Sequence, residues 1–257
     1  MKLQTPTFNL RTRAKAAAIH LSFSLLVAVA AAALVFGLWY PWPYRLISGG
    51  QELFLLLTSV DLVLGPLLTF FVFDLAKGGR HLQRDLAVIA ALQLAALGYG
   101  LHTVYAVRPV TLVFEQDRFR VIAASDVHLP ELIAAPAAYR QLPLTGPWLL
   151  GTRAARDSAE RNEVLSLGLN GIDIGQRPSF WQPFDLSKPA VLAKSRPVAS
   201  LIEHYPSGKA QIEATLRELK LPADEVAFLP LSARRQWVVL LNRTGDVVGF
   251  APFDGFF

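Results

Sequence analysis

The chain has 257 residues, of which 53% are hydrophobic and 18% are charged, and it contains no cysteine. The lack of cysteine excludes disulfides, thiolate catalysis and cysteine-ligated metal sites. The formal net charge of +5 does not predict nucleic acid as a partner, because residues 108–257 hold 17 Lys or Arg against 16 Asp or Glu and the excess precedes them.

Three apolar runs precede residue 108, and each exceeds the ~18 residues that mark a candidate membrane span. They predict transmembrane helices over about 16–40, 53–73 and 86–107, which together form a transmembrane region of residues 16–107. The mean hydropathy of +0.36 is also high for a soluble domain. We therefore expect a multi-pass membrane protein that contacts the lipid bilayer.

The first apolar run follows a basic stretch, which raises the alternative of a cleaved signal peptide. The run is longer than the ~7–15 residues of a typical signal-peptide core. It also leads into WYPWPY, residues 39–44, an aromatic cluster typical of a helix that leaves the bilayer. We therefore expect a retained anchor.

The basic residues predict the orientation of the chain. The N-terminal tail, residues 1–15, contains Lys2, Arg11, Arg13 and Lys15. The loop between the second and third spans contains Lys77, Arg80 and Arg84, whereas the first loop contains only Arg45. Because Lys and Arg are enriched in cytoplasmic loops, the tail and the second loop are expected in the cytoplasm. With three spans, residues 108–257 are then expected on the outer side of the membrane. If the spans lie in the inner membrane of a bacterium, that side is the periplasm.

Residues 108–257 predict a separate α+β domain with a mostly antiparallel sheet. Two β-rich runs around Gln116-Asp117 indicate a hairpin. Asp126 is expected to cap a short helix, and Asp157 or Ser158 a longer one that follows a strand at 148–154.

The remainder of the domain alternates loop, helices and strands. Residues 176–188 read as a long loop rich in proline and aromatic residues. Helices are expected at 190–204, with a break at Pro197 as an alternative, and at 209–219. Three strands follow, in EVAFLPL, QWVVLLN and DVVGFAPF, and the last two meet at the hairpin signal NRTG.

Asp61 lies inside the second apolar run. At a helix centre in lipid, an aspartate costs about 2.5–3.5 kcal/mol. The 15 Leu, Val and Phe residues of 53–73 contribute about −5 to −9 kcal/mol, so the span inserts despite the aspartate. A cost tolerated in this way favours a role for the carboxyl group.

Thr58, Asp61, Gly65 and Thr69 are spaced 3, 4 and 4 residues apart, which places them on one helix face. Such a face of small and polar residues is expected to meet other helices. Pro66 is expected to kink the helix beside the aspartate.

Two main roles stay open for Asp61, with a proton or ion pathway as a third. In the first, the protonated carboxyl hydrogen-bonds a backbone carbonyl or Tyr99, which lies at a similar depth in the third span, and locks the three helices. In the second, it receives a polar group from another membrane protein.

Several motifs resemble the TfpX/TfpZ group of type IV pilin accessory proteins. They are FGLWYP (36–41), SVDLVLGPLLT (59–69), RDLAVIAALQLAALGYG (84–100), RPVTLVFEQDRFRVI (108–122) and LPLTGP (142–147). The resemblance implies an inner-membrane helper that binds a particular pilin, and other assembly proteins of that membrane, and assists pilin stability, pilus assembly or pilus dynamics. It implies no cofactor, metal or catalytic residue.

The motifs that match best contain the candidate interaction residues. These are Asp61, Gly65 and Pro66 in the membrane, and the hairpin residues Glu115, Asp117, Arg118 and Phe119. The tail after Asp254 and the loop 176–188 match nothing in the group.

An enzyme is the alternative, such as a membrane-bound pilin-modifying transferase with a periplasmic active site. Asp126, His128 and Glu131 form D-x-H-x-x-E, but helix capping explains the two acids more simply than metal binding. The chain has no G-x-S-x-G, H-E-x-x-H or Walker A motif. We therefore expect a protein that is not an enzyme.

Overall fold

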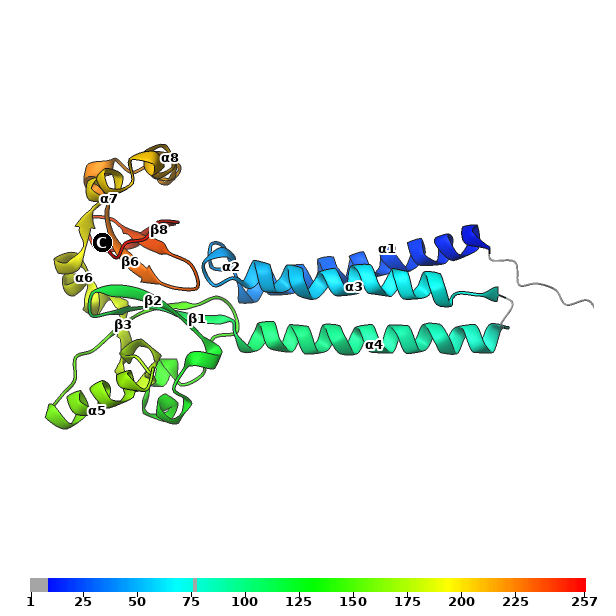
Figure 1. The fold of residues 1–257 in the computed structure, drawn as a ribbon. Helices are drawn as coiled ribbons and strands as arrows, with labels where there is room; N and C mark the ends of the chain where they lie inside the picture. The colour runs from blue at the N-terminus through cyan, green and yellow to red at the C-terminus, as the bar shows by residue number, and fades with distance from the viewer. Residues whose placement is uncertain (1–8, 76–77) are drawn as a thin grey trace, which may run out of the picture. The chain divides into compact units, whose positions relative to one another are not determined.

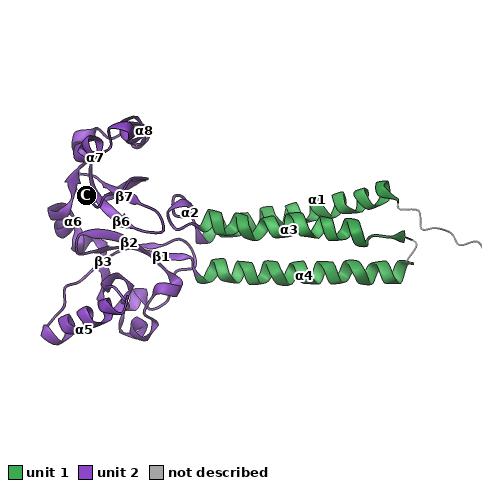
Figure 2. Ribbon diagram, in the orientation of Figure 1, with its two compact units in different colours: residues 1–38, 50–106 green, residues 39–49, 107–257 purple. Residues whose placement is uncertain are grey.

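The computed structural model describes residues 9–75 and 78–257 (Figure 1). It divides into two compact units. Unit 1 comprises residues 1–38 and 50–106, and unit 2 comprises residues 39–49 and 107–257 (Figure 2). Lys77 and residues 1–8 of the expected tail, including Lys2, lie outside the described residues.

Unit 1 consists of three long helices. Helix α1 covers Leu10–Leu34 and continues as a π-helical turn over Val35–Trp39, α3 covers Gly50–Val72, and α4 covers Gly79–Ala106. All three are long and apolar enough to cross a membrane. The expectation of three apolar helices followed by a sheet domain is therefore confirmed.

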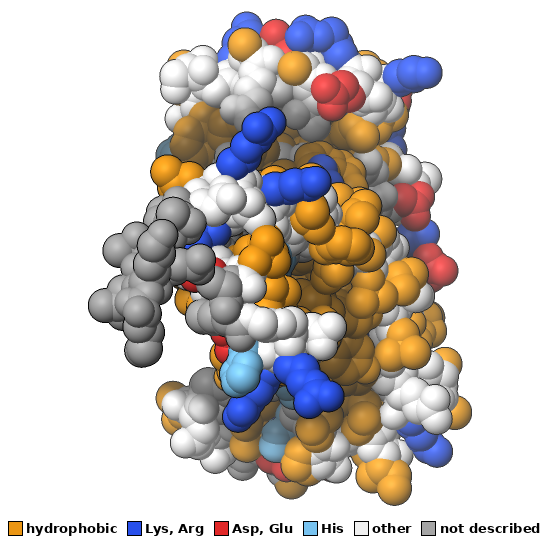
Figure 3. All heavy atoms as spheres, turned by 90° about the vertical axis from the view of Figure 1, so that its right-hand side faces the viewer, with side chains coloured by type: hydrophobic (Ala, Val, Ile, Leu, Met, Phe, Trp, Pro, Cys, Tyr) orange, Lys and Arg blue, Asp and Glu red, His pale blue; other side chains and the backbone are white. Residues whose placement is uncertain are grey.

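Helices α1 and α4 begin several residues before the expected spans. The hydropathy of the sequence marks only the apolar part of each helix, whereas Arg and Lys are good helix formers and extend it. Basic residues thus lie in the first turns of the helices: Arg11, Arg13, Lys15, Arg80 and Arg84. Figure 3 looks at the end of unit 1 where α1 and α4 begin, and it shows basic side chains in blue there.

Helix α3 packs against both α1 and α4. Its buried positions include Phe54, Thr58, Gly65 and Thr69, which form one face. At its C-terminal end, Arg13 of α1 donates to the carbonyl of Phe71 at 2.7 Å and pairs with Asp74 at 3.0 Å. A cation in this position satisfies carbonyls that the helix leaves open at its end.

Unit 2 is built on one mixed sheet with the strand order β4-β3-β1-β2-β6-β7-β8, and β5 also pairs with β6, at Ala227 and Phe228. The strands are β1 Pro109–Glu115, β2 Arg118–Ala123, β3 Trp148–Thr152, β4 Trp181–Pro183, β5 Arg196–Pro197, β6 Ala227–Ser232, β7 Trp237–Leu241 and β8 Val247–Ala251. Only the pairs β1–β3 and β2–β6 are parallel among the described strands. The expectation of a mostly antiparallel sheet is confirmed.

Helices cover both faces of the β6–β8 part of the sheet. They are α2 Tyr44–Ile47 and α6 Lys188–Lys194 on one face, and α7 Val198–His204 and α8 Lys209–Leu219 on the other. Helix α5, Ser158–Leu169, lies instead beside the turn between β1 and β2. In β7, Val238 packs in the cluster formed with α7 and α8, whereas Val239 packs in the cluster that contains residues of α2 and α6. A strand buried on both faces reads as a continuous apolar run, as WVVLL does.

The first interhelix loop belongs to the core of unit 2. Ile47 is fully buried among residues of four strands, β1, β2, β6 and β7. Tyr44 packs against the same cluster, and the centroid of its ring lies 5.8 Å from the ring centroid of Phe250. A loop of aromatic and apolar residues thus contributes to the domain core instead of only leaving the membrane.

Two local expectations need correction, and one stated alternative is confirmed. Asp126 does not cap a helix: it ends a 3-10 turn at Ala124–Asp126, and the next turn begins after His128. The segment 176–188 is not a simple loop, because it contains β4 and several 3-10 turns. Pro197 does break the helix at 190–204, since it forms β5 between α6 and α7.

Two polar turns fix the ends of unit 2 elements. Asp157 caps α5 by accepting a hydrogen bond from the Glu160 amide at 2.8 Å, so the cap is Asp157 rather than Ser158. In the β7–β8 turn, hydrogen bonds from Lys188, Thr244 and Asn242 lower the pKa of Asp246 from 3.8 to about 2.

Candidate functional site

A chain of hydrogen bonds links all three helices of unit 1. His20 of α1 has its Nδ1 2.5 Å from the Thr69 hydroxyl of α3 and its Nε2 2.6 Å from Oε1 of Gln93 on α4. The amide nitrogen of Gln93 donates to the backbone carbonyl of Asp61 at 3.1 Å. These polar groups therefore satisfy one another inside an apolar bundle.

The chain of bonds has one consistent direction. The carbonyl oxygen of the Gln93 side chain can only accept, so Nε2 of His20 donates to it. In a neutral imidazole the other nitrogen then accepts, and the Thr69 hydroxyl donates. Thr69, His20 and Gln93 thus each donate to the next group, and the Asp61 carbonyl ends the series.

Gly65 makes room for this arrangement. A Cβ added at Gly65 would lie only 2.0 Å from Nε2 of Gln93. Pro66, in the next position, lacks the N–H that would bond the Leu62 carbonyl one turn earlier. The missing side chain at Gly65 therefore leaves the space in which the Gln93 side chain reaches the α3 backbone.

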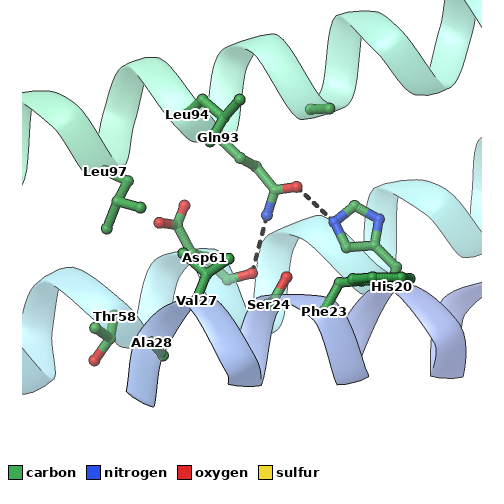
Figure 4. Close-up of a pocket in the computed structure, with 11 residues that line it drawn as sticks. His20, Phe23, Ser24, Val27, Ala28, Thr58, Asp61, Gln93, Leu94 and Leu97 are labelled. Atoms are coloured by element: carbon green, nitrogen blue, oxygen red, sulfur yellow. Dashed lines mark hydrogen bonds between the residues drawn. The ribbon is translucent and has the colours of Figure 1, made fainter. Parts of the chain in front are cut away.

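The Asp61 side chain lines a hollow of about 220 Å³ together with Ser24, Thr58 and Leu97. Figure 4 shows its carboxyl group extending from α3 into the space beside α4. Among the described residues, no group hydrogen-bonds this carboxyl, although the Asp61 backbone carbonyl accepts from Gln93.

The structure places Thr58 and Tyr99, two further candidate residues of the predicted intramembrane interaction site, in different ways. Thr58 is buried, and its hydroxyl donates to the carbonyl of Phe54 at 2.9 Å. Tyr99, in contrast, is 75% exposed and does not line the hollow. The expected bond between Asp61 and Tyr99 is therefore wrong: Tyr99 lies off the buried face of α4, which contains Ile89, Gly100 and Val104.

Neither His20 nor Gln93 was among the predicted site residues. The sequence does contain a signal for His20, because a histidine inside an apolar run is as unusual as the aspartate. No such signal indicates that His20 would meet Gln93, since their pairing depends on how the helices are rotated and offset.

In unit 2, the hairpin residue Glu115 forms a buried polar cluster. It is 4% exposed, lies 2.6 Å from Nε of Arg120 and accepts from the Gly175 amide at 2.9 Å. Arg120 also pairs with Asp173 at 2.7 Å. This cluster ties the hairpin to the segment that follows α5.

The other three hairpin residues separate into surface and core. Asp117 and Arg118 pair at 2.8 Å on the surface, and the hydrogen bond to Asp117 raises the pKa of Arg118. Phe119 is fully buried in the core, so this predicted interaction residue is not available to a partner. A hollow of about 520 Å³ lies beside the turn, lined by Arg118 and by Leu165 and Leu169 of α5 among others.

Comparison with known proteins gives a consistent picture. Residues 8–49 match the family of the fimbrial assembly protein FimB. The fimbrial assembly protein of serogroup E1 from Dichelobacter nodosus is 34% identical over 246 residues, which is 95% of this chain and 96% of the relative. The serogroup I protein of the same organism has the same identity and coverage.

A third relative covers part of the chain. The Dichelobacter nodosus protein of serogroups C1 and C2 is 41% identical over 119 residues, which is 46% of this chain and 91% of that relative. No solved structure matches the chain.

Proposed function

This chain belongs to the family of the Dichelobacter nodosus fimbrial assembly proteins, and we propose that it is an accessory protein of type IV pilus biogenesis that binds pilin in the bacterial inner membrane. It assists the stability of pilin, the assembly of pilin into the pilus, or the dynamics of the pilus. Under this proposal the protein is not an enzyme. The finer likeness to the TfpX/TfpZ group is part of this proposal.

The observation that carries the proposal is the extent of the similarity. It covers 95% of the chain, so it includes the helices of unit 1 and the sheet of unit 2 alike. A match confined to an apolar helix would say only that both proteins enter membranes, whereas a match across both units supports a shared role.

The composition of unit 2 supports the proposed topology. Unit 2 combines residues 39–49, which follow α1, with residues 107–257, which follow α4. One membrane crossing precedes the first segment and three precede the second. Both segments then lie on the same side of the membrane, as a common core requires. Basic residues in the first turns of α1 and α4 then favour the cytoplasm for those ends and the periplasm for unit 2.

This topology suits a helper of pilin. The resemblance described above concerns pilins, which wait in the inner membrane on one apolar helix with the head in the periplasm. A protein with three spans and a periplasmic domain offers a surface to each part of pilin. Other inner-membrane assembly proteins are further partners under the same proposal.

The test is a clean deletion strain of the source bacterium, examined for surface pili by electron microscopy and for total pilin by immunoblot. We expect pili to be lost or reduced and to return when the gene is restored. Normal numbers of pili together with normal pilin would contradict the proposal. The intact mass of pilin should be unchanged, since a mass shift on deletion would favour the pilin-modifying enzyme.

A further inference from the structure

An open groove runs along unit 1. Two hollows, of about 220 and 430 Å³, both have walls from α1 and α4 and a floor from α3. They share His20, Phe23 and Ala90, so they form one continuous surface, which we call the bundle groove.

The bundle groove follows a large part of a membrane span. Its wall on α1 extends from Thr12 to Ala28, and the part from Ala16 onwards, within the expected span, is about 18 Å of helix at ~1.5 Å per residue. The hydrocarbon core of a bilayer is about 30 Å thick. The groove therefore follows more than half of the membrane depth, which is long enough to hold several turns of a helix.

The walls suit close helix packing. Small side chains alternate with larger apolar ones along them, as with Ala16, Ala28 and Ala90 beside Phe23 and Leu94. Helices in membranes associate through small residues that let backbones approach, and through hydrogen bonds between helices.

Besides the Lys15 and Ser24 side chains of its α1 wall, the groove offers one hydrogen-bonding group on its floor, the Asp61 carboxyl. His20, Thr69 and Gln93 use their polar atoms on one another and on the Asp61 backbone. The Asp61 carboxyl has no such bond within the described residues, and it lines the groove. A carboxyl in a lipid environment is costly unless it is hydrogen-bonded, so the occupant should supply a polar group at this depth.

We propose that the bundle groove receives a single transmembrane helix, and that a hydroxyl, amide or ammonium of this helix bonds the Asp61 carboxyl. The inference rests on the proposed function, because the helix we assign to the groove is that of pilin. Lipid tails could fill the same space, but they offer Asp61 nothing to bond. A helix offers both an apolar surface and a donor at a fixed depth.

The lack of cysteine makes a direct test possible, because each introduced cysteine is unique in the chain. Val27→Cys and Leu94→Cys place a thiol in the groove walls. Leu56→Cys is the matched control, since Leu56 is exposed on α3 but does not line the groove. Each full-length variant is expressed in cells whose pilin has one cysteine in its apolar helix, scanned through four successive positions, and the membranes are oxidised.

We expect disulfide adducts with pilin from Val27→Cys and Leu94→Cys, and at most a trace from Leu56→Cys. In the Val27→Cys background, Asp61→Leu should lower the adduct yield about threefold or more, the effect of one interhelical hydrogen bond in a bilayer. Asp61→Asn keeps a polar side chain at the same place and should retain most of the yield. Immunoblots establish that each variant reaches the wild-type amount.

Four results would overturn the inference. They are equal yields from all three cysteines, a disulfide between two copies of this chain instead of an adduct with pilin, an adduct with a different membrane protein, and no adduct from variants that are present at normal amounts. If these occur while the deletion strain still lacks pili, the groove assignment fails and the proposed function stands. Normal pili in the deletion strain would remove the proposed function itself.

Discussion

Replacing Ile47 by alanine tests whether the first interhelix loop is part of the folded core. The side chain is 0% exposed and packs in the cluster that contains Leu229 and Val239. Truncating a buried isoleucine to alanine costs about 2–5 kcal/mol. Because Ile47 is fully enclosed, we expect a loss of about 3 kcal/mol in the free energy of unfolding of unit 2, which is roughly a 150-fold shift of the equilibrium.

The measurement is pulse proteolysis of the full-length protein in detergent over a urea series, following the fragment that contains unit 2. Trp42→Ala is the control from the same loop, because Trp42 is 66% exposed. It should lose no more than about 1 kcal/mol, the worth of its contact with Arg45. If the two variants unfold at the same urea concentration, the loop does not belong to the core and our description of unit 2 is wrong.

Gly65→Ala should lower the stability of unit 1 in detergent by about 1–3 kcal/mol, because the new Cβ displaces Gln93 and breaks its two hydrogen bonds. Gly175→Ala should lower the urea stability of unit 2 by about 2 kcal/mol, because the Cβ would lie 2.5 Å from the Glu115 carboxylate. The hydrogen bonds that lower the pKa of Asp246 to about 2 from 3.8 also stabilise unit 2, and this stabilisation is present above pH 3.8. That stabilisation should shrink as the pH falls towards 2, which urea midpoints measured between pH 5 and 2 would show.

The Gly65→Ala and Asp246 expectations each have a matched control. Gly98→Ala adds the same methyl group to α4 where nothing lies within 4 Å, so it should keep the melting temperature or raise it slightly, because alanine favours a helix more than glycine does. If it destabilises as much as Gly65→Ala, contact with the amide is not the cause. Asp246→Asn should remove its part of the pH dependence, and a variant that keeps the full dependence would assign it to other carboxylates.

The sequence predicted the α3 face well because that face depends on a single helix. The spacing of Thr58, Gly65 and Thr69 repeats with the helical period, and all three are buried. The groups that meet this face were not predictable in the same way. Neighbouring helices can rotate and slide by one residue without changing their own periodicity, so the sequence did not distinguish Gln93 from Tyr99 as the neighbour of Asp61.

In unit 2, the strands with strong apolar patterns were predictable, and the short segments were not. The runs around β1, β2 and β7 are apolar and β-branched, which favours strands whatever surrounds them. Strand β4 has only three residues, Trp181–Pro183, and it exists because β3 offers an edge to pair with. The cluster at residues 39–44 was interpreted only as the end of a span, because aromatic residues suit a membrane interface as well as a core, although its Tyr44 packs against the core of unit 2.

The burial of Ile47 also constrains how the protein can be made. The ribosome completes Ile47 long before it reaches β7, which ends at Leu241, so a core position stays unfilled while the helices enter the membrane. Once β7 arrives, closing the core ties residue 47 to residues nearly two hundred positions later and encloses α3 and α4 in one loop. In a nascent chain that stops before β7, the loop that contains Ile47 would stay unpacked. Proteases that degrade unfinished membrane proteins would then have a defined place to cut the chain.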